Sequence, residues 1–354
     1  MMVHNENAIF FCISDNYSFA VANMILGLKK YSPSLKDRVD IIIYHDGISS
    51  QNIELLSVLH NNILFYTIEF PAEFYDMLNH RLVKKWGVYV LAKLKGFELV
   101  RRYKRSLFLD ADMLIRGDVS KIFDIEEEIA WRKVIAWNPN EIFKDVIGTN
   151  DYISACNAGL IYFTDKLNKY QITNENILEA FSVIKDLKRG GIDERILAYI
   201  VYKNKIKLRE LDISYNCPVP DSKKLDDVKI IHFLDYKGII TKPWKNLVAY
   251  LYFEDWAINY KKWIDMGGQG LVDFNIEDKY NLFGFDKAAK ILNLNRINLQ
   301  QQSEIQNLNK INLQYEMKIR VLQKKYNGIK NSTIWRLTEP LRNFLDRIKK
   351  IRRL

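Results

Sequence analysis

Short apolar runs alternate with helical patterns along the first 265 residues, and this alternation is the strongest constraint on what the chain can fold into. Runs typical of buried strands cover residues 8–14, 39–46, 63–70 and 105–110. Patterns typical of helices lie between them, at residues 19–31, 49–60 and 90–100. Strands and helices that alternate at this spacing predict an α/β fold with a largely parallel sheet and helices on both faces.

The composition agrees with a packed domain that has an acidic partner. The chain has 354 residues, of which 48% are hydrophobic and 13% aromatic, enough to bury a large core. The net charge of +10 favours a phosphate-bearing substrate or an anionic membrane as partner. No apolar run approaches the roughly 20 residues that a membrane-spanning helix needs.

The cysteines and the first residues bear on the compartment. The three cysteines, Cys12, Cys156 and Cys217, are far apart and odd in number, which favours a reduced, cytoplasmic setting. The first residues show no basic region followed by an apolar stretch, so we expect no signal peptide.

Residues 286–328 form a second kind of segment, which has no glycine or proline before Gly328. Side chains spaced alternately three and four apart make a seam: Ile291, Leu294, Asn298, Gln301, Ile305, Leu308, Asn312, Tyr315, Ile319, Leu322 and Tyr326. This spacing predicts a coiled coil and therefore a homo-oligomer, and a single solvated helix is the alternative.

The last residues, 329–354, combine apolar and basic side chains. One face of a predicted helix carries Trp335, Leu337, Leu341, Phe344, Ile348 and Ile351. Basic side chains make up the rest: Arg336, Arg342, Arg347, Lys349, Lys350, Arg352 and Arg353. A basic amphipathic helix of this kind predicts binding to an anionic membrane surface, and docking on the chain itself is the alternative. The basic residues bring no known nucleic-acid module, so we expect no nucleic-acid partner.

Two aspartates follow the strand at residues 105–110. Residues i and i+2 of an extended segment point to the same side, so Asp110 and Asp112 are expected to converge. Converging carboxylates repel one another unless a cation lies between them. Mg²⁺ or Mn²⁺ suits such oxygen ligands and commonly bridges to substrate phosphates.

Three functions are compatible with this motif: a nucleotide-sugar glycosyltransferase, a phosphohydrolase of the haloacid dehalogenase type, and a non-catalytic scaffold with a degenerate enzyme fold. The phosphohydrolase motif needs Thr or Val where this chain has Leu114, and it stands close to the N-terminus. Here about a hundred residues come first, which makes the phosphohydrolase the weakest of the three.

Ordered blocks across residues 8–265 resemble glycosyltransferase family 8, which includes glycogenin and bacterial lipopolysaccharide galactosyl- and glucosyltransferases. Residues 107–123, "LFLDADMLIRGDVSKIF", are similar to the family's metal-binding block. The blocks around it are "ISDNYSFA" (13–20), "YHDGISSQN" (44–52), "LAKLKGFEL" (91–99), "CNAGLIYF" (156–163), "GGIDERIL" (190–197) and "HFLDYKGIITKPW" (232–244).

The resemblance implies a GT-A, Rossmann-like fold and a retaining, metal-dependent transfer of glucose or galactose from a UDP-sugar. Mn²⁺ or Mg²⁺ would be bound by Asp110, Asp112 and His232, with Asp110 also near the donor. Lys242 would place a positive charge near the leaving diphosphate. The acceptor would be lipopolysaccharide core or another lipid-linked glycan, reached from the inner face of the cytoplasmic membrane.

Further residues match the family's donor-binding positions. Asn16 and Tyr17 would lie at the ribose and the uracil ring. Asn157 would hold the donor sugar, and Gly238 would let backbone amides approach the phosphates. Lys93 stands where the family usually has a donor-contacting arginine.

Three departures from the family pattern mark this chain. Asp193 and Glu194 replace an Asp-Gln pair near the anomeric carbon, and we expect Glu194 to face that carbon. The segment between His232 and Lys242 is longer than the family's usual spacing, so Lys237 is an alternative to Lys242 as the lysine that contacts the phosphates. Ser14 replaces a uracil-contacting aspartate. These departures leave a catalytically degenerate scaffold as the alternative.

The predicted organisation has four parts. A GT-A domain covers residues 1–265, and a linker covers 266–285. A coiled coil then covers 286–328, and the tail helix covers 329–354.

Overall fold

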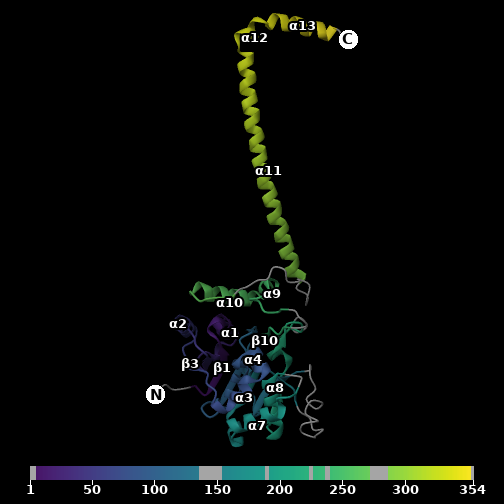
Figure 1. Ribbon diagram of the computed structural model, residues 1–354. Helices are drawn as coiled ribbons and strands as arrows, with labels where there is room; N and C mark the ends of the chain where they lie inside the picture. Colours follow the sequence, from purple (N-terminus) through teal and green to yellow (C-terminus); the bar gives the residue numbers. More distant parts are fainter. Residues whose placement is uncertain are drawn as a thin grey trace. The chain divides into compact units, whose positions relative to one another are not determined.

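A computed structural model describes residues 5–134, 154–187, 191–222, 226–235, 240–271 and 286–351. The chain divides into two compact units, Met1–Asp286 and Lys287–Leu354 (Figure 1), and each is considered by itself.

The first unit is built on a seven-stranded sheet. Its strand order is β3 (Ile63–Thr67), β2 (Val39–His45), β1 (Asn7–Ile13), β4 (Arg105–Leu109), β7 (Cys156–Thr164), β6 (Ile129–Lys133) and β8 (Leu208–Glu210). Neighbouring strands run parallel except that β7 is antiparallel to both β4 and β6. The largely parallel sheet expected from the sequence is therefore present, with one reversed strand, β7, between β4 and β6.

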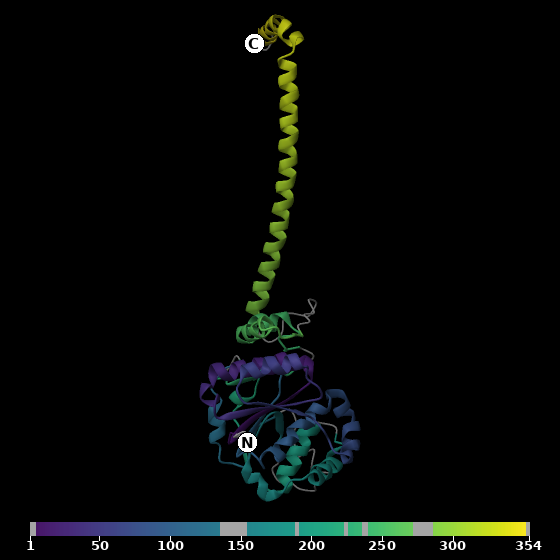
Figure 2. The same ribbon diagram turned by 90° about the vertical axis from the view of Figure 1, so that its left-hand side faces the viewer.

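Helices cover both faces of this sheet (Figure 2). The α-helices among the described residues of the unit are α1 (Ser18–Tyr31), α2 (Ser50–Leu59), α3 (Tyr75–Asn79), α4 (Arg81–Trp86), α5 (Gly96–Leu99), α7 (Asn174–Ile184), α8 (Ile192–Lys203), α9 (Leu247–Tyr252) and α10 (Glu254–Asp265). Its 3-10 helices are η1 (Asp15–Tyr17), η2 (Pro33–Leu35), η3 (Ala72–Phe74), η4 (Val88–Lys95), η5 (Ser120–Asp124), η6 (Asp165–Tyr170) and η7 (Ile213–Tyr215).

The core follows the alternation of side chains along the strands. Phe10 of β1 packs against Phe108 and Phe163 on the face that α7 and α8 cover. On α1, Phe19 packs against Trp256 and Tyr260 of α10. The sheet is thus enclosed by apolar side chains on both faces, and its polar chemistry is confined to strand ends.

The helix expected at residues 90–100 is instead the 3-10 helix η4 followed by one turn of α-helix, α5. The change occurs at Gly96, where a Cβ atom would overlap the ring of Phe163. The missing side chain lets this turn lie close to the sheet, which places the buried Lys93 beneath the strand ends.

A second, three-stranded sheet matters most for function. Its order is β5 (Met113–Ile115), β10 (Ile230–His232) and β9 (Cys217–Pro218). Strand β10 pairs antiparallel with β5, so that His232 lies opposite Met113. It pairs parallel with β9, which brings residues near Cys217 to the same place.

The part of the second unit that the structure describes is helical, with α11 (Asp286–Lys330), α12 (Thr333–Leu337) and α13 (Glu339–Ile351). The tail expected as one helix is therefore two, separated at Thr338. Pro340 explains the break, because proline is excluded from a helix interior but tolerated in the first turn. Among the helices that the structure describes, none is long and apolar enough to cross a membrane.

Candidate active site

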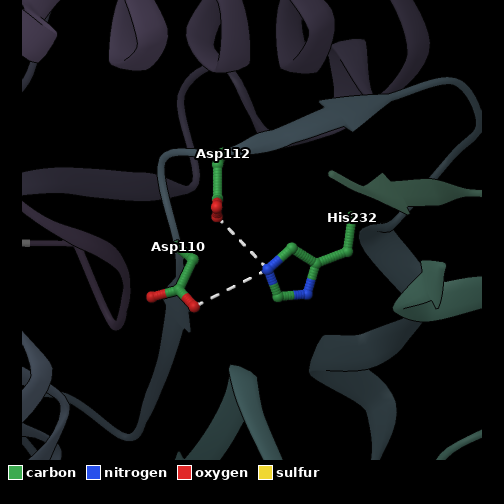
Figure 3. A group of neighbouring side chains, drawn as sticks. All are labelled: Asp110, Asp112 and His232. Carbon is green, nitrogen blue, oxygen red and sulfur yellow. Dashed lines mark hydrogen bonds and ion pairs between the residues drawn. The ribbon is translucent and has the colours of Figure 1, made fainter. Parts of the chain in front are cut away.

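Asp110, Asp112 and His232 meet where the two sheets approach each other (Figure 3). Asp110 follows β4, and its backbone N–H donates to the Gly159 carbonyl at 2.8 Å. Asp112 precedes β5, and its carbonyl accepts from the backbone N–H of Phe233 at 2.9 Å. Backbone pairing between distant segments therefore fixes all three residues.

The side chains of this cluster fit a hard divalent cation. His232 Nε2 lies 3.2 Å from Asp112 Oδ1 and 3.8 Å from Asp110 Oδ2 (Figure 3). One potential ligand atom from each residue lies within 4.8 Å of the other two. Two carboxylates and one imidazole form a donor set that suits Mn²⁺ or Mg²⁺.

Positive side chains compensate the two carboxylates unequally. Burial raises the pKa of Asp110, and the nearby charge of Lys93 only partly opposes this. Burial acts in the same direction on Asp112, but His232 and Lys242 outweigh it and lower the pKa of Asp112. Lys242 Nζ donates to Asp112 Oδ2 at 2.5 Å. Burial disfavours the charge on Lys242, yet Asp112 raises the pKa of this ammonium group.

Lys93 links this cluster to the start of α8. Its side chain is buried, with Nζ 2.7 Å from Asp193 Oδ2 and 3.5 Å from Asp110 Oδ1. Burial acts against the charge, but Asp110 and Asp193 together raise the pKa of Lys93. A permanently charged lysine therefore holds two carboxylates from distant parts of the chain.

Glu194 lies in the first turn of α8, next to Asp193. One of its carboxylate oxygens accepts the Gly191 N–H at 2.9 Å, as in a helix-capping box. Burial, followed by the charge of Asp193, raises its pKa from 4.5 to about 7, while Lys93 and the backbone N–H groups of Gly191 and Ala158 act against the rise. Asp193 and Glu194 are thus brought to the Lys93 side of the cluster.

The raised pKa of Glu194 predicts a pH dependence of stability. A carboxyl group whose pKa is raised by folding contributes stability that is present below about pH 4.5 and lost as the pH rises through about 7. Glu194→Gln removes this ionisation, so the melting temperature of the variant relative to wild type should increase between pH 5 and pH 8. Thermal unfolding at both pH values checks this, and parallel curves for the two proteins would contradict it.

Asn157 stands at the start of β7 and is buried. Its Oδ1 accepts from the Gly159 N–H at 3.2 Å and from Asn216 Nδ2 at 2.8 Å. Asn216 Oδ1 in turn lies 2.9 Å from His232 Nδ1. Asn157 is therefore connected to the metal cluster through Asn216.

The loops at the carboxyl ends of β1 and β2 form the other side of the site. The Ser14 hydroxyl donates to Asn16 Oδ1 at 2.5 Å. The half-buried Tyr17 packs against Phe19 and against Trp244, which follows Lys242 closely in the chain. These contacts connect the expected nucleotide loop with the expected phosphate segment.

The structure accounts for most of the expected site residues in two connected groups. Asp110, Asp112, His232 and Lys242 form one group, which joins Lys93, Asp193 and Glu194 through the Lys93–Asp110 ion pair. Tyr17 lies near the Lys242 end of this group, because its ring packs against Trp244, and the Trp244 ring in turn lies 5.8 Å from Lys242 Nζ. Gly238 and Lys237 lie outside the described residues.

Sequence reasoning missed three residues that organise the site. Asn216 and Gly159 carry no local signal, because neither belongs to a charged or metal-binding pattern. Asp15 follows the first predicted strand and carries no metal-binding pattern either, yet its Oδ1 accepts from Ser49 N–H at 3.0 Å and from Asn52 Nδ2 at 2.7 Å. Asp15 thereby ties the loop after β1 to the start of α2.

The sequence matches the model of a known protein family. The family model for glycosyl transferase family 8 matches residues 8–247, about two thirds of the chain. No curated protein sequence matches the chain significantly.

Solved structures share the fold. The galactosyltransferase LgtC in complex with donor and acceptor sugar analogues superimposes with a TM-score of 0.57 at 18% identity, covering 73% of this chain and 99% of that one. An active-site mutant of LgtC, in which glutamine is replaced by glutamate, gives 0.54 at 19% identity, with 73% and 95% covered. The bifunctional glycosyltransferase WbbM gives 0.55 at 17% identity, with 75% of this chain and 52% of WbbM covered.

Proposed function

The chain belongs to glycosyltransferase family 8, and from this premise we propose that it moves glucose or galactose from a UDP-sugar to a surface-glycan acceptor, such as lipopolysaccharide core or another lipid-linked glycan. The transfer proceeds with retention of configuration at the anomeric carbon. The main observation that supports the proposal is that Asp110, Asp112 and His232 converge beside Lys242. Two carboxylates and an imidazole that face one another supply the ligand types that a divalent cation prefers, and a bound cation would offset the repulsion between the carboxylates.

The metal cluster and Lys242 form the diphosphate side of the proposed site. Mn²⁺ or Mg²⁺ held by Asp110, Asp112 and His232 would neutralise the charge that develops on the departing diphosphate. Lys242 lies against Asp112, so its ammonium group adds a second positive charge at the same place. Stabilisation of developing charge by fixed groups is commonly the largest catalytic contribution. Gly238 is proposed to let backbone amides approach the same phosphates.

The sugar side of the proposed site is formed by Lys93, Asp193, Glu194 and Asn157. Lys93 keeps Asp193 and Asp110 in fixed positions, which orients two carboxylates without side-chain freedom. Asn157 is proposed to hold a hydroxyl of the donor sugar. Glu194 is proposed to face the anomeric carbon, where its ionisation near pH 7 lets it serve as acceptor or donor of a hydrogen bond.

The nucleoside is proposed to bind against Ser14, Asn16 and Tyr17. The ring of Tyr17 is only half-buried, which leaves surface for stacking with a base. The relatives support a sugar donor and acceptor, since LgtC was crystallised with analogues of both. An active-site mutant of LgtC carries a glutamine-to-glutamate change, the type of exchange that the family resemblance implies at Glu194.

Release of UDP from nucleotide sugars tests the proposal directly. The full-length protein is incubated with UDP-glucose, UDP-galactose and other donors, with Mn²⁺ or with a chelator. We expect UDP release from one donor that stops when the metal is removed. Metal-dependent binding of UDP without release would mean that the acceptor is needed for turnover. Neither release nor metal-dependent UDP binding would refute the enzyme and favour the degenerate scaffold.

We propose that the C-terminal unit pairs the enzyme with a second copy of itself and binds it to a membrane surface. Apolar side chains of the predicted seam are exposed along α11, among them Ile305, Leu308, Ile319 and Leu322. On α13, Leu341, Phe344, Leu345 and Ile348 are spaced as one helical face and are also partly or fully exposed. We propose that α11 pairs in a coiled coil and that α13 lies on the anionic inner face of the cytoplasmic membrane.

Truncation after residue 285 tests both roles of the C-terminal unit. The shortened protein should be monomeric by light scattering and should no longer sediment with anionic phospholipid vesicles, because it lacks both apolar faces. Neutral vesicles are the control, since basic residues add little attraction to them. Equal binding of both forms to anionic vesicles would refute the membrane role.

A further inference from the structure

One buried hydrogen-bond chain links the metal cluster to the expected sugar site. It runs from His232 Nδ1 to Asn216 Oδ1 at 2.9 Å, from Asn216 Nδ2 to Asn157 Oδ1 at 2.8 Å, and ends at the Gly159 N–H. The exposed fractions are 0% for Asn216, 2% for His232 and 5% for Asn157. With so little access to water, each polar atom in the chain needs a protein partner.

The orientation of every group in this hydrogen-bond chain follows from the Gly159 N–H, because its role as a donor is unambiguous. A backbone N–H can only donate, so the Asn157 atom that faces Gly159 is the carbonyl oxygen. The Asn216 atom that faces this oxygen must therefore be the amide nitrogen. The other branch of the Asn216 amide is then an oxygen, and it must accept a hydrogen bond from His232 Nδ1–H.

We propose that Asn216 is a positioning residue that fixes both the ring of His232 and the amide of Asn157. A histidine that binds a metal ion must be neutral, whereas in the metal-free structure Nε2 can carry a proton toward Asp112 Oδ1. In the metal-bound state, with its proton on Nδ1, the ring has its lone pair on Nε2. That nitrogen faces both carboxylates of the cluster, and the other ring nitrogen points away from them (Figure 3). Asn216 thereby presents Nε2 as the ligand atom.

The same residue sets the sugar-binding side. Because Asn157 Oδ1 is occupied by Asn216 and Gly159, the amide nitrogen of Asn157 occupies the opposite branch. Its two hydrogens are then directed away from Asn216 and can donate to a hydroxyl of the proposed donor sugar. This inference rests on the proposed function for the identity of the metal and sugar sites, and it adds the residue that connects them.

Gly159 supports the arrangement by shape. A Cβ atom at this position would overlap His232 Cε1 and Nδ1, so only glycine lets the ring lie against β7. The ring is thus confined on one side by backbone and oriented on the other by Asn216. Partners that hold the second nitrogen of a metal-binding histidine commonly change metal affinity about 10- to 100-fold when removed.

Two substitutions separate the functions of Asn216. Asn216→Leu removes both hydrogen bonds, and we expect Mn²⁺ affinity in the presence of UDP to fall about 10- to 100-fold. Asn216→Asp keeps an acceptor for His232 Nδ1 but loses the donor to Asn157. Its Mn²⁺ affinity should stay within about threefold of wild type, while UDP-sugar binding weakens relative to UDP binding. Electron paramagnetic resonance and calorimetry on the full-length protein measure these affinities.

A matched control is Asn259→Leu, which removes another buried amide, bonded to Asn23 in the packing of α10 on α1. It should leave Mn²⁺ affinity unchanged. If Asn216→Leu does not fold, nuclear magnetic resonance of the wild type and of Asn216→Asp still tests the role of Asn216, because it reports which ring nitrogen of His232 carries the proton. The chain has five histidines, so ¹⁵N-histidine labelling gives few signals, and the His232 signal is assigned by its loss in His232→Gln.

The tautomer of His232 gives a readout that does not depend on turnover. In the wild-type protein with Mg²⁺ and UDP at pH 8, we expect the proton on Nδ1. A proton on Nε2, or unchanged Mn²⁺ affinity in Asn216→Leu, would overturn the role of Asn216 alone. A wild-type protein that binds no Mn²⁺ with or without UDP would overturn the metal site of the proposed function and this inference with it.

Discussion

Asp112→Asn is expected to reduce metal-dependent UDP release about 100- to 1,000-fold, the scale on which removal of one fixed electrostatic contributor acts. Asp112 contacts both His232 and Lys242, so its charge orders the metal cluster and the diphosphate-binding lysine together. The asparagine side chain has nearly the same shape but no charge. Mn²⁺ affinity should fall in parallel, as measured by electron paramagnetic resonance.

The control for this substitution is Asp118→Asn in the same segment of the chain. Asp118 is exposed, and its side chain accepts hydrogen bonds from Ser120 at 2.8 and 2.9 Å. Its replacement should leave UDP release and Mn²⁺ affinity at wild-type values. Equal activity of Asp112→Asn and Asp118→Asn would show that the cluster binds no catalytic metal.

Lys93→Met is expected to have the largest effect on stability, about 3–5 kcal/mol of unfolding free energy, because it leaves buried carboxylates without their cation. Methionine fills a similar volume, so the loss reflects charge more than packing. Lys93 approaches Asp193 at 2.7 Å and Asp110 at 3.5 Å, with only 6% of its side chain exposed. Urea denaturation of the full-length protein measures the loss.

The pH dependence of Lys93→Met distinguishes charge from packing. Burial already raises the pKa of Asp110, and without the cation nothing at Lys93 opposes this, so protonation of Asp110 favours the folded state. The stability of the variant should then be greatest at low pH and fall as the pH rises, so that its deficit relative to wild type is smaller at pH 5 than at pH 8. A deficit independent of pH would contradict this account.

Lys95→Met provides the matched control for Lys93→Met. Lys95 forms a surface ion pair with Glu98 one helical turn away, and such pairs contribute at most about 1 kcal/mol. We expect a small change in unfolding free energy without the pH dependence. A loss as large as that of Lys93→Met would indicate that η4 is sensitive to any lysine replacement.

The pattern of apolar and capping residues predicted most strands and helices, because these elements depend on residues that are close together in the sequence. The apolar runs at 8–14, 39–46 and 105–110 became β1, β2 and β4 within about one residue at either end. Ser49 stands before α2 as its N-cap and accepts the Asn52 N–H, as serine at a helix start commonly does. The break at Thr338 was missed because hydrophobic spacing continues across Pro340, although proline cannot lie in a helix interior.

The sequence by itself determined the alternating strands and helices and the convergence of Asp110 and Asp112, since an extended backbone places residues i and i+2 on one side. Only the tertiary structure decided what meets them. His232 is 120 positions from Asp112 and reaches it because β10 pairs with β5 in one register. Asn216 arrives through the adjacent β9 pairing, and Lys93 finds Asp193 one hundred positions away. Strand register and close packing depend on the whole chain, and no local pattern encodes them.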